Sequence, residues 1–461
     1  MPWLQVQILL GPLQEQPATL QFPMRLRDLF QARSFPRKSP GGILEIAGVL
    51  LLLLYLLAGV IYSDILPRTA QFSDAEEYLQ LSYNLLHGPG FSLDGVHLTA
   101  SRPPGYAFFL STIRAMGGGF FGFRVAQFLL LSGTIFLLYR LGSGRRMFAG
   151  LLIVTGLVIC YPILFYISAT IYPQTLAGFL FILALTLTLV TPRGLVLNLV
   201  TGFSYGTLIL VVPTFLFTMA VVFGTARFLK MIRWRDVLLM ALAASFVIGA
   251  WTLRNAVLFH RFVPIASNSG VNFLAGNNEN VVVYEGSAAD AMQPYYYATE
   301  NLDEFQTDSY YWRVALSYIQ EHPWRALVNY LERVLNFFNT MNAYATQNNE
   351  EFSAWKQIVM AISYALLLAL LGWRLTDIKR FPLTPREKLF LIVYVLSAFT
   401  SAIFLTRIRL RLPFDYLVIA ITAWNLSRRL EIWMTKRVSA PAFQTPSKEH
   451  SNPPDSPALQ I

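Results

Sequence analysis

The amino-acid sequence predicts an all-α polytopic membrane protein, and three observations support this class. Of the 461 residues, 55% are hydrophobic and 13% are charged, and the mean hydropathy is +0.47. A chain this apolar does not fold around one water-soluble core. Its apolar residues form runs of about 20, the length that an α-helix needs to cross the hydrocarbon of a bilayer. Basic residues gather between alternate runs, as in the cytoplasmic loops of membrane proteins.

The first predicted transmembrane helix runs from Gly42 to Tyr62, and only Tyr55 interrupts its apolar centre. It follows Arg37 and Lys38 and lacks a small-residue cleavage site, so we expect it to remain as an anchor. Similar runs predict helices at about 121–141, 146–164, 170–190, 195–210, 212–229, 236–256, 355–373, 388–406 and 411–427. The sequence therefore predicts about ten transmembrane helices.

The distribution of charge predicts the orientation of these helices. An N-terminus in the cytoplasm places most of the 36 basic residues on the inner side, as the positive-inside tendency requires. Most acidic residues, including those from Asp74 to Glu77 and from Glu279 to Glu351, then lie outside. The net charge of +10 is thus a property of the inner face, which indicates contact with anionic membrane lipids and no nucleic-acid partner.

This topology divides the chain into three regions. Residues 1–42 form a basic cytoplasmic tail, residues 43–430 form the transmembrane domain, and residues 431–461 form a second cytoplasmic tail whose Pro and Ser content predicts disorder. Two outer loops, at about 63–120 and 258–354, are long enough to hold a site. Cys160 is the only cysteine, so we expect no intramolecular disulfide, and it fits as a small apolar residue in a span.

The first outer loop contains a predicted helix that begins at Ser73. Ser73 and Glu76 have the spacing of a capping box, and Gly88-Pro89-Gly90 predicts that the helix ends near His87. Glu76 is therefore expected to cap the helix, with catalysis as the alternative. Leucines along the helix give it enough apolar surface to lie in the membrane interface.

Asp74, Glu77 and Tyr78 share one face of this helix, because positions three and four apart are neighbours. Acidic groups clustered beside a membrane, with Arg102 close behind, indicate chemistry on a charged lipid head group. The alternative for Asp74 is electrostatic: an acid in the first helical turn stabilises the helix dipole by about 0.3–1 kcal/mol. From the residues alone, the two interpretations of Asp74 have equal weight.

Several arginines on the outer side are candidate phosphate ligands. Arg102 precedes Pro103 and Pro104, which predict the start of a second short helix, and it could bind phosphate or extend to the interface. Arg254, beside Trp251, poses the same choice. Arg407, Arg409 and Arg411 lie outside within five residues, against the positive-inside tendency, so we expect an anion to compensate them: a bound phosphate or lipid head groups.

The order of four motifs resembles that of bacterial membrane glycosyltransferases of the protein mannosyltransferase and aminoarabinose transferase type, which are similar to glycosyltransferase family 39. The resemblance covers about residues 43 to 430. Its motifs are Asp74 to Tyr78 with Asn84 to Ser92 and Arg102-Pro103-Pro104-Gly105-Tyr106; Trp251 to Asn255 with Phe262 to Asn277; Glu321-His322-Pro323; and Arg407 to Pro413. Each motif alone is weak, and their ordered set is fairly specific.

The resemblance implies the GT-C fold, with interfacial helices in the first outer loop. It also implies a bacterial inner-membrane enzyme that transfers a sugar from a polyprenyl-phosphate donor, with inversion, to a glycolipid, glycan or protein acceptor at the periplasmic or external face. Asp74 matches the catalytic aspartate of the family, and Arg102, Arg254, Arg409 and Arg411 match positions near the donor phosphate. Glu77 is the candidate for a second catalytic carboxylate or for positioning the acceptor. The candidates for acceptor or sugar binding are Tyr78, Tyr106, Asn255 and Asn272.

The sequence departs from this family at two places. Tyr172-Pro173-Gln174-Thr175 stands where relatives often carry an acidic residue, and Val212-Pro213 stands where they often have Arg-Pro. The second departure removes a candidate phosphate ligand. The sequence therefore leaves open a different donor, or an inactive protein.

Metal binding and two other function classes complete the alternatives. His87, Asp94 and His97 have no zinc-site spacing, whereas Asp74 with Glu77 could bind a divalent cation.

A transporter or flippase of lipid-linked sugars would also need many spans, but it usually carries ionisable groups near the bilayer midplane, and the predicted polar clusters lie in the outer loops. The third class is an assembly protein that recognises glycolipid through residues 268–280.

Overall fold

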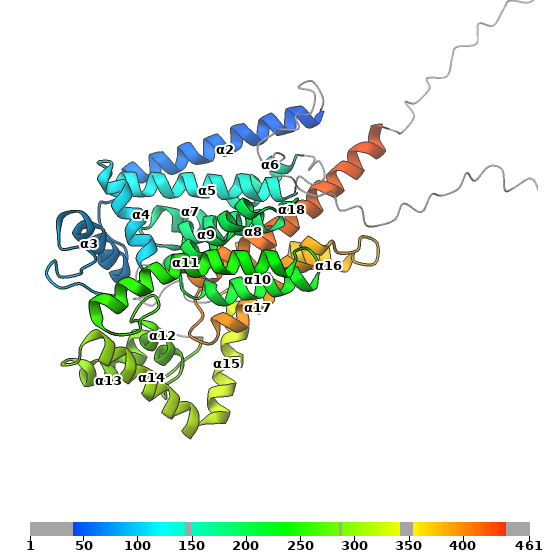
Figure 1. The fold of residues 1–461 in the computed structure, drawn as a ribbon. Coiled ribbons are helices and arrows are strands. Elements are labelled where there is room, and N and C mark those ends of the chain that lie inside the picture. The colour runs from blue at the N-terminus through cyan, green and yellow to red at the C-terminus, as the bar shows by residue number, and fades with distance from the viewer. Residues whose placement is uncertain (1–39, 143–148, 285–287, 342–353, 439–461) are drawn as a thin grey trace, which may run out of the picture.

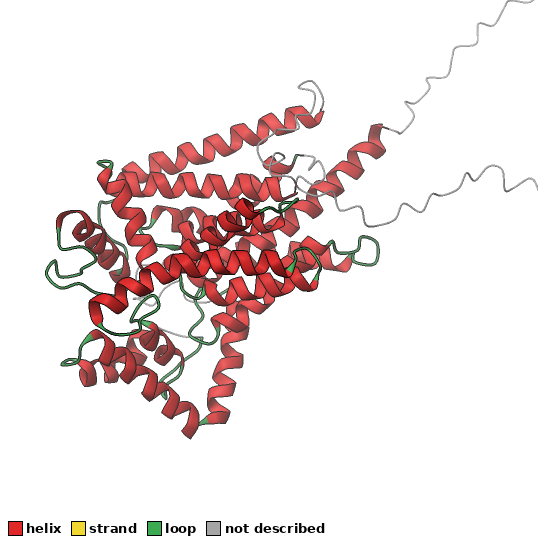
Figure 2. Cartoon of the chain, viewed as in Figure 1, coloured by secondary structure: helices red, strands yellow, loops and turns green. Residues whose placement is uncertain are grey.

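The computed structural model describes residues 40–142, 149–284, 288–341 and 354–438. These residues form α-helices joined by loops, without a β-strand among them (Figure 2). The predicted all-α class is therefore confirmed. Residues 1–39 and 439–461, which make up most of the two predicted tails, lie outside the described residues.

A helix occupies the position of each predicted span. Four helices are long and apolar enough to cross a membrane: α2 (Pro40–Ile65), α5 (Phe120–Gly142), α11 (Trp234–Phe259) and α16 (Ala354–Thr376). A bent pair, α6 (Gly150–Ile159) and α7 (Ile163–Ala169), meets at 75° and could form a fifth crossing. The bundle is completed by α8 (Gln174–Leu189), α9 (Leu195–Val211), α10 (Phe215–Phe228), α17 (Pro385–Ser401) and α18 (Ile408–Val438). The chain is a multi-pass membrane protein.

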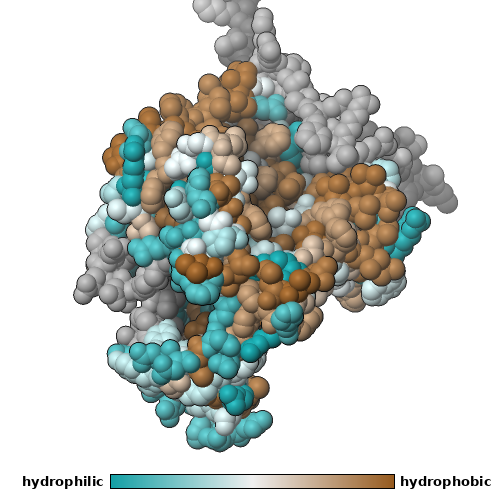
Figure 3. Space-filling view, turned by 60° about the vertical axis from the view of Figure 1, so that its left-hand side comes forward, coloured by the Kyte–Doolittle hydropathy of each residue, from teal (hydrophilic) through white to brown (hydrophobic). Residues whose placement is uncertain are grey.

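The shorter helices differ from α2 in what surrounds them. Nearly every residue of α8 is buried against other helices, so its length need not match the thickness of the hydrocarbon. By contrast only 11% of the apolar stretch of α2 is buried, and Leu50, Leu53 and Leu57 point outward. Hydrophobic residues cover broad areas of the bundle on the face in Figure 3, while hydrophilic residues concentrate at its lower end. The outward face of α2 is therefore suited to lipid contact.

The helices of the two long loops gather at the left and lower left of Figure 1. They are α3 (Ser73–His87), α4 (Pro104–Ala115), α12 (Ser269–Gly276), α13 (Ala288–Thr299), α14 (Glu304–Glu321) and α15 (Pro323–Phe337). The first residues of α2 and the last residues of α18 lie to the right in the same view. The helices of both loops are therefore on the side away from the two ends of the described chain.

A fully buried arginine fastens the bundle beneath the first loop. Arg124 of α5 donates to the backbone carbonyls of Ala169, Leu66 and Pro67 at 3.0, 3.2 and 2.7 Å. The last carbonyls of a helix have no partner within the helix, so the guanidinium satisfies groups at the ends of α7 and α2. It also fixes the point at which the chain leaves the bundle toward α3.

The boundaries of α3 match the prediction, because the helix begins at Ser73 and ends at His87. The residue in the N-cap position is Phe72, one residue before the predicted cap, and Glu76 is exposed. The second short helix, α4, begins at Pro104 as predicted.

Candidate active site

The carboxylate of Asp74 lies between groups from three distant parts of the chain. Arg102 Nη2 lies 2.7 Å from Asp74 Oδ1, and Arg409 Nη1 lies 3.2 Å from Asp74 Oδ2. The hydroxyl of Tyr172 also donates to Oδ2. These residues and Glu77 form what we call the Asp74 cluster, which joins α3 to the segments that precede α4 and α8 and to the start of α18.

Glu77 completes the cluster through Arg102. The guanidinium donates from Nε to Glu77 Oε2 at 2.5 Å and from Nη2 to Oε1 at 2.8 Å, a two-point geometry that strengthens an ion pair. Because Asp74 and Glu77 bond the same guanidinium, the predicted shared face of the helix is confirmed. Tyr78, on the same helix, is buried. Its ring lies edge-on to the ring of Tyr106, with 5.1 Å between the ring centres.

Opposing effects set the proton affinity of Asp74. Burial alone would raise the pKa of Asp74, but the charges of Arg409 and Arg102 and the hydrogen bonds from Tyr172 and Arg102 outweigh burial and lower the pKa to about 2. The side chain keeps 23% of its surface exposed, so a substrate can reach it. Asp74 is therefore an ionised, accessible carboxylate whose basicity depends on its arginine neighbours.

Tyr172 is the member of the cluster that sequence reasoning missed as a site residue. It bonds Asp74 Oδ2 and Arg409 Nη1, and the Arg409 guanidinium lies 5.0 Å from the centre of its ring. The available signal was the departure from the family pattern. Tyr172 begins the four-residue segment at which the relatives often carry an acid.

Arg254, Asn255 and Asn272 are not in contact with the cluster. Arg254 Nη1 donates to Thr99 O and to Asn255 Oδ1, both at 2.9 Å. Thr99 also bonds Glu304 of the second loop, at 2.5 Å between side-chain oxygens. Arg254 and Asn255 therefore hold the two outer loops against α11. Asn272 is exposed and donates to the backbone of its own helix region, at Asn268 O.

Arg411 and Tyr106 lie deeper, among the helices. Arg411 pairs with Asp415 at 3.2 Å, and the two side chains are 2% and 0% exposed. Arg411 also donates to Phe337 O and Asn339 O, both at 3.0 Å. This buried pair corrects the expectation that the polar clusters lie only in the outer loops. Tyr106 is buried too, and its hydroxyl bonds Gln127 Oε1 at 3.0 Å.

A divalent cation does not fit between Asp74 and Glu77, because the guanidinium of Arg102 occupies the space between their carboxylates. Within the described ranges there is no group of three His, Cys, Asp or Glu side chains placed to hold a metal ion. His97 and Asp94 bond each other at the exposed surface of the first loop, 2.7 Å apart.

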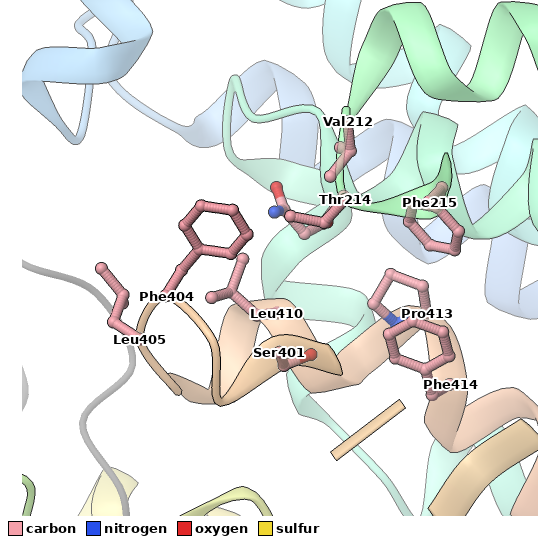
Figure 4. A pocket seen from close by; sticks show the side chains of 10 residues that line it. Val212, Thr214, Phe215, Ser401, Phe404, Leu405, Leu410, Pro413 and Phe414 are labelled. Carbon is pink, nitrogen blue, oxygen red and sulfur yellow. The ribbon is translucent and has the colours of Figure 1, made fainter. Parts of the chain in front are cut away.

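A partly enclosed pocket lies next to the cluster along the chain. Its lining includes Gln174, two residues beyond Tyr172, and Leu410, the residue after Arg409. The empty space is about 400 Å³, including its mouth toward solvent. Figure 4 shows Val212 and Thr214 on one side of this space and Leu410 and Ser401 on the other. We call it the Gln174 pocket.

Comparisons with known proteins give a likeness of structure only. No family model and no curated protein matches the chain. The crystal structure of ArnT from Cupriavidus metallidurans bound to undecaprenyl phosphate is 11% identical, over 83% of this chain and 78% of that chain, with a TM-score of 0.42. The apo state of the same protein is 10% identical over 82% and 76%, with a TM-score of 0.41. Structural similarity at this level of identity and TM-score does not assign an activity to the chain. An activity has to be inferred from the side chains of the site.

Proposed function

We propose that this protein is an inverting glycosyltransferase that moves a sugar from a polyprenyl-phosphate donor to a lipid, glycan or protein acceptor at the outer face of the membrane. The observation that carries the proposal is the accessible carboxylate of Asp74, held between Arg102 and Arg409 at the loop-bearing end of the bundle. The motif resemblance supports the class of donor.

Asp74 acts as the general base in this reaction. An acceptor hydroxyl is a poor nucleophile at neutral pH, so a carboxylate within about 2.6–3.2 Å must take its proton during attack. The acceptor oxygen bonds to the anomeric carbon while the bond from that carbon to the phosphate oxygen breaks. Asp74 receives the proton, and polyprenyl phosphate leaves with the bonding electrons. One direct displacement inverts the anomeric centre.

Arg409 and Arg102 stabilise the charge that grows on the leaving phosphate. Both side chains are more than three-quarters buried, and fixed cations in a partly dry site stabilise developing charge more effectively than water does. Glu77 holds Arg102 in position. Arg254 and Arg411 have a different role, because their N–H groups donate to other groups of the protein. Arg254 stabilises the outer loops, and Arg411 stabilises the helix bundle.

Substitution of Asp74 by Asn tests the proposal. The purified variant should transfer sugar about 100- to 10,000-fold more slowly, as expected for loss of a general base, while still binding the donor. Asp64→Asn is the matched control, because Asp64 is an exposed acid in the last turn of α2, just before the first outer loop. Transfer by Asp74→Asn at the wild-type rate would overturn the proposal.

A second function is favoured by one observation. The Arg411–Asp415 pair is buried inside the bundle, and ionisable groups at such positions often mark the path of a transported substrate. A flippase of lipid-linked sugars would translocate its substrate in proteoliposomes without changing it, and Asp74→Asn would leave that rate unaffected. Release of free polyprenyl phosphate that depends on Asp74 would exclude this function as the sole activity.

A further inference from the structure

The Gln174 pocket contains a buried polar atom that the surrounding protein leaves unsatisfied. Gln174 is 6% exposed, and its Oε1 accepts no hydrogen bond from the part of the chain that the structure describes. An unpaired buried acceptor destabilises a folded protein, because the group has lost its water without gaining a donor. A ligand with a hydroxyl group in the pocket would remove this defect.

The rest of the lining combines hydroxyl groups with aromatic surfaces. Thr214 and Ser401 contribute hydroxyls, and Phe404 and Phe414 contribute rings. Ligand pockets usually combine apolar walls with a few polar groups that fix orientation. A sugar ring presents both kinds of surface, because its C–H groups are apolar and its hydroxyls lie around the edge.

The two positions at which the sequence departs from the family pattern, Gln174 and Val212, both line this pocket. No charged side chain is among the described residues that line it. A charged sugar entering the pocket would lose hydration without gaining a counter-charge from these walls. An uncharged sugar would not incur that cost.

We propose that the Gln174 pocket holds the sugar of the donor and that Gln174 Oε1 accepts a hydrogen bond from one of its hydroxyls, so that the protein selects an uncharged sugar. This inference rests on the proposed transferase function. In this arrangement Arg409, which directly precedes the lining residue Leu410, would bind the phosphate of the same donor, and its partner Asp74 would face the anomeric carbon. A hydrocarbon occupant, such as the first units of the isoprenoid, would leave Gln174 Oε1 unsatisfied.

Donor-binding measurements on the purified full-length protein test the inference. The probes are undecaprenyl phosphate alone and the same lipid carrying glucose, galacturonate or 4-aminoarabinose. Wild-type protein should bind the glucose form more tightly than the bare lipid and more tightly than either charged form. Gln174→Leu should weaken binding of the glucose form by about five- to tenfold, the size of one hydrogen bond. The variant should bind the bare lipid with unchanged affinity. Gln174→Glu should shift preference toward 4-aminoarabinose.

A control and the opposing outcomes make the test decisive. Gln320→Leu, at an exposed position of α14, should change none of these affinities. If Gln174→Leu instead strengthens binding of the bare lipid, the pocket holds isoprenoid and the inference is overturned. A preference of the wild type for a charged sugar also overturns it, while Asp74-dependent transfer would still support the proposed function. Failure to bind any probe would overturn both.

Discussion

Arg409 Nη1 lies 3.2 Å from Asp74 Oδ2, although 335 positions separate the two residues in the sequence. The contact joins the start of the last helix to the first turn of α3. The proposed base is therefore neutralised by the residue that is proposed to hold the donor phosphate. When a phosphate binds Arg409, it competes with Asp74 for the same positive charge.

This competition predicts a difference between two pH profiles. In the free protein the pKa of Asp74 is lowered to about 2, chiefly because the charges of Arg409 and Arg102 outweigh burial. Below its pKa the group is protonated and cannot accept a proton, so activity falls as the pH falls. Since kcat/KM reports the free enzyme and kcat reports the complex, the acidic limb of kcat should lie at higher pH than that of kcat/KM. Coincident limbs would argue against competition for Arg409.

Tyr172→Phe should also change the pKa of Asp74 and with it the pH profile. The variant loses the hydroxyl that donates to Asp74 Oδ2 and keeps the ring against Arg409. Because this hydrogen bond lowers the pKa of Asp74, we expect the acidic limb of kcat/KM to shift upward by about one pH unit, the size of one hydrogen bond. Tyr83→Phe, at an exposed tyrosine of α3, should leave the limb unchanged. An unshifted limb in Tyr172→Phe would show that the hydroxyl does not act on Asp74.

Glu77 and Glu76 are adjacent acids with different expected roles. Glu77 holds Arg102 by a two-point contact, whereas Glu76 is exposed. Glu77→Gln should reduce transfer roughly tenfold by loosening Arg102, and Glu76→Gln should have no effect. Initial rates of the two purified variants check this. Equal losses would mean that the charge of the loop, rather than the position of Arg102, controls the rate.

Arg411 is expected to govern stability rather than donor binding. Arg411→Ala leaves Asp415 buried without its partner, which should destabilise the protein by about 3–5 kcal/mol. Replacing both residues, as Arg411→Met with Asp415→Leu, should recover much of that loss. Thermal unfolding in detergent measures the effect. If Arg411→Ala stays stable and loses donor affinity, Arg411 binds phosphate as the sequence resemblance implied.

Much of the helical framework could be predicted from the sequence because a bilayer imposes long apolar runs on the helices that contact it. The end of α3 was also predictable, because Gly88-Pro89-Gly90 is a local stop signal. The brevity of α8 was not predictable, because burial among other helices removes the requirement for a full membrane-spanning length.

The candidate site divides in the same way. The shared face of Asp74 and Glu77 follows from helix geometry and was predicted. The contacts of Asp74 with Tyr172 and Arg409 join distant segments, so no local pattern could reveal them. The Arg411–Asp415 pair is different. Its spacing of four residues on one helix is a visible signal of an ion pair, and it points to an internal partner for Arg411.

The anchoring of Leu66 and Pro67 by Arg124 limits which part of the chain could allow α3 to move relative to the bundle. These two residues are tied to α5, so a displacement of α3 away from Arg409 could not begin at the end of α2. It would have to be accommodated by residues 68–72, the short link between the anchored carbonyls and the first turn of α3. The length of this link would then limit how far Asp74 could separate from Arg409.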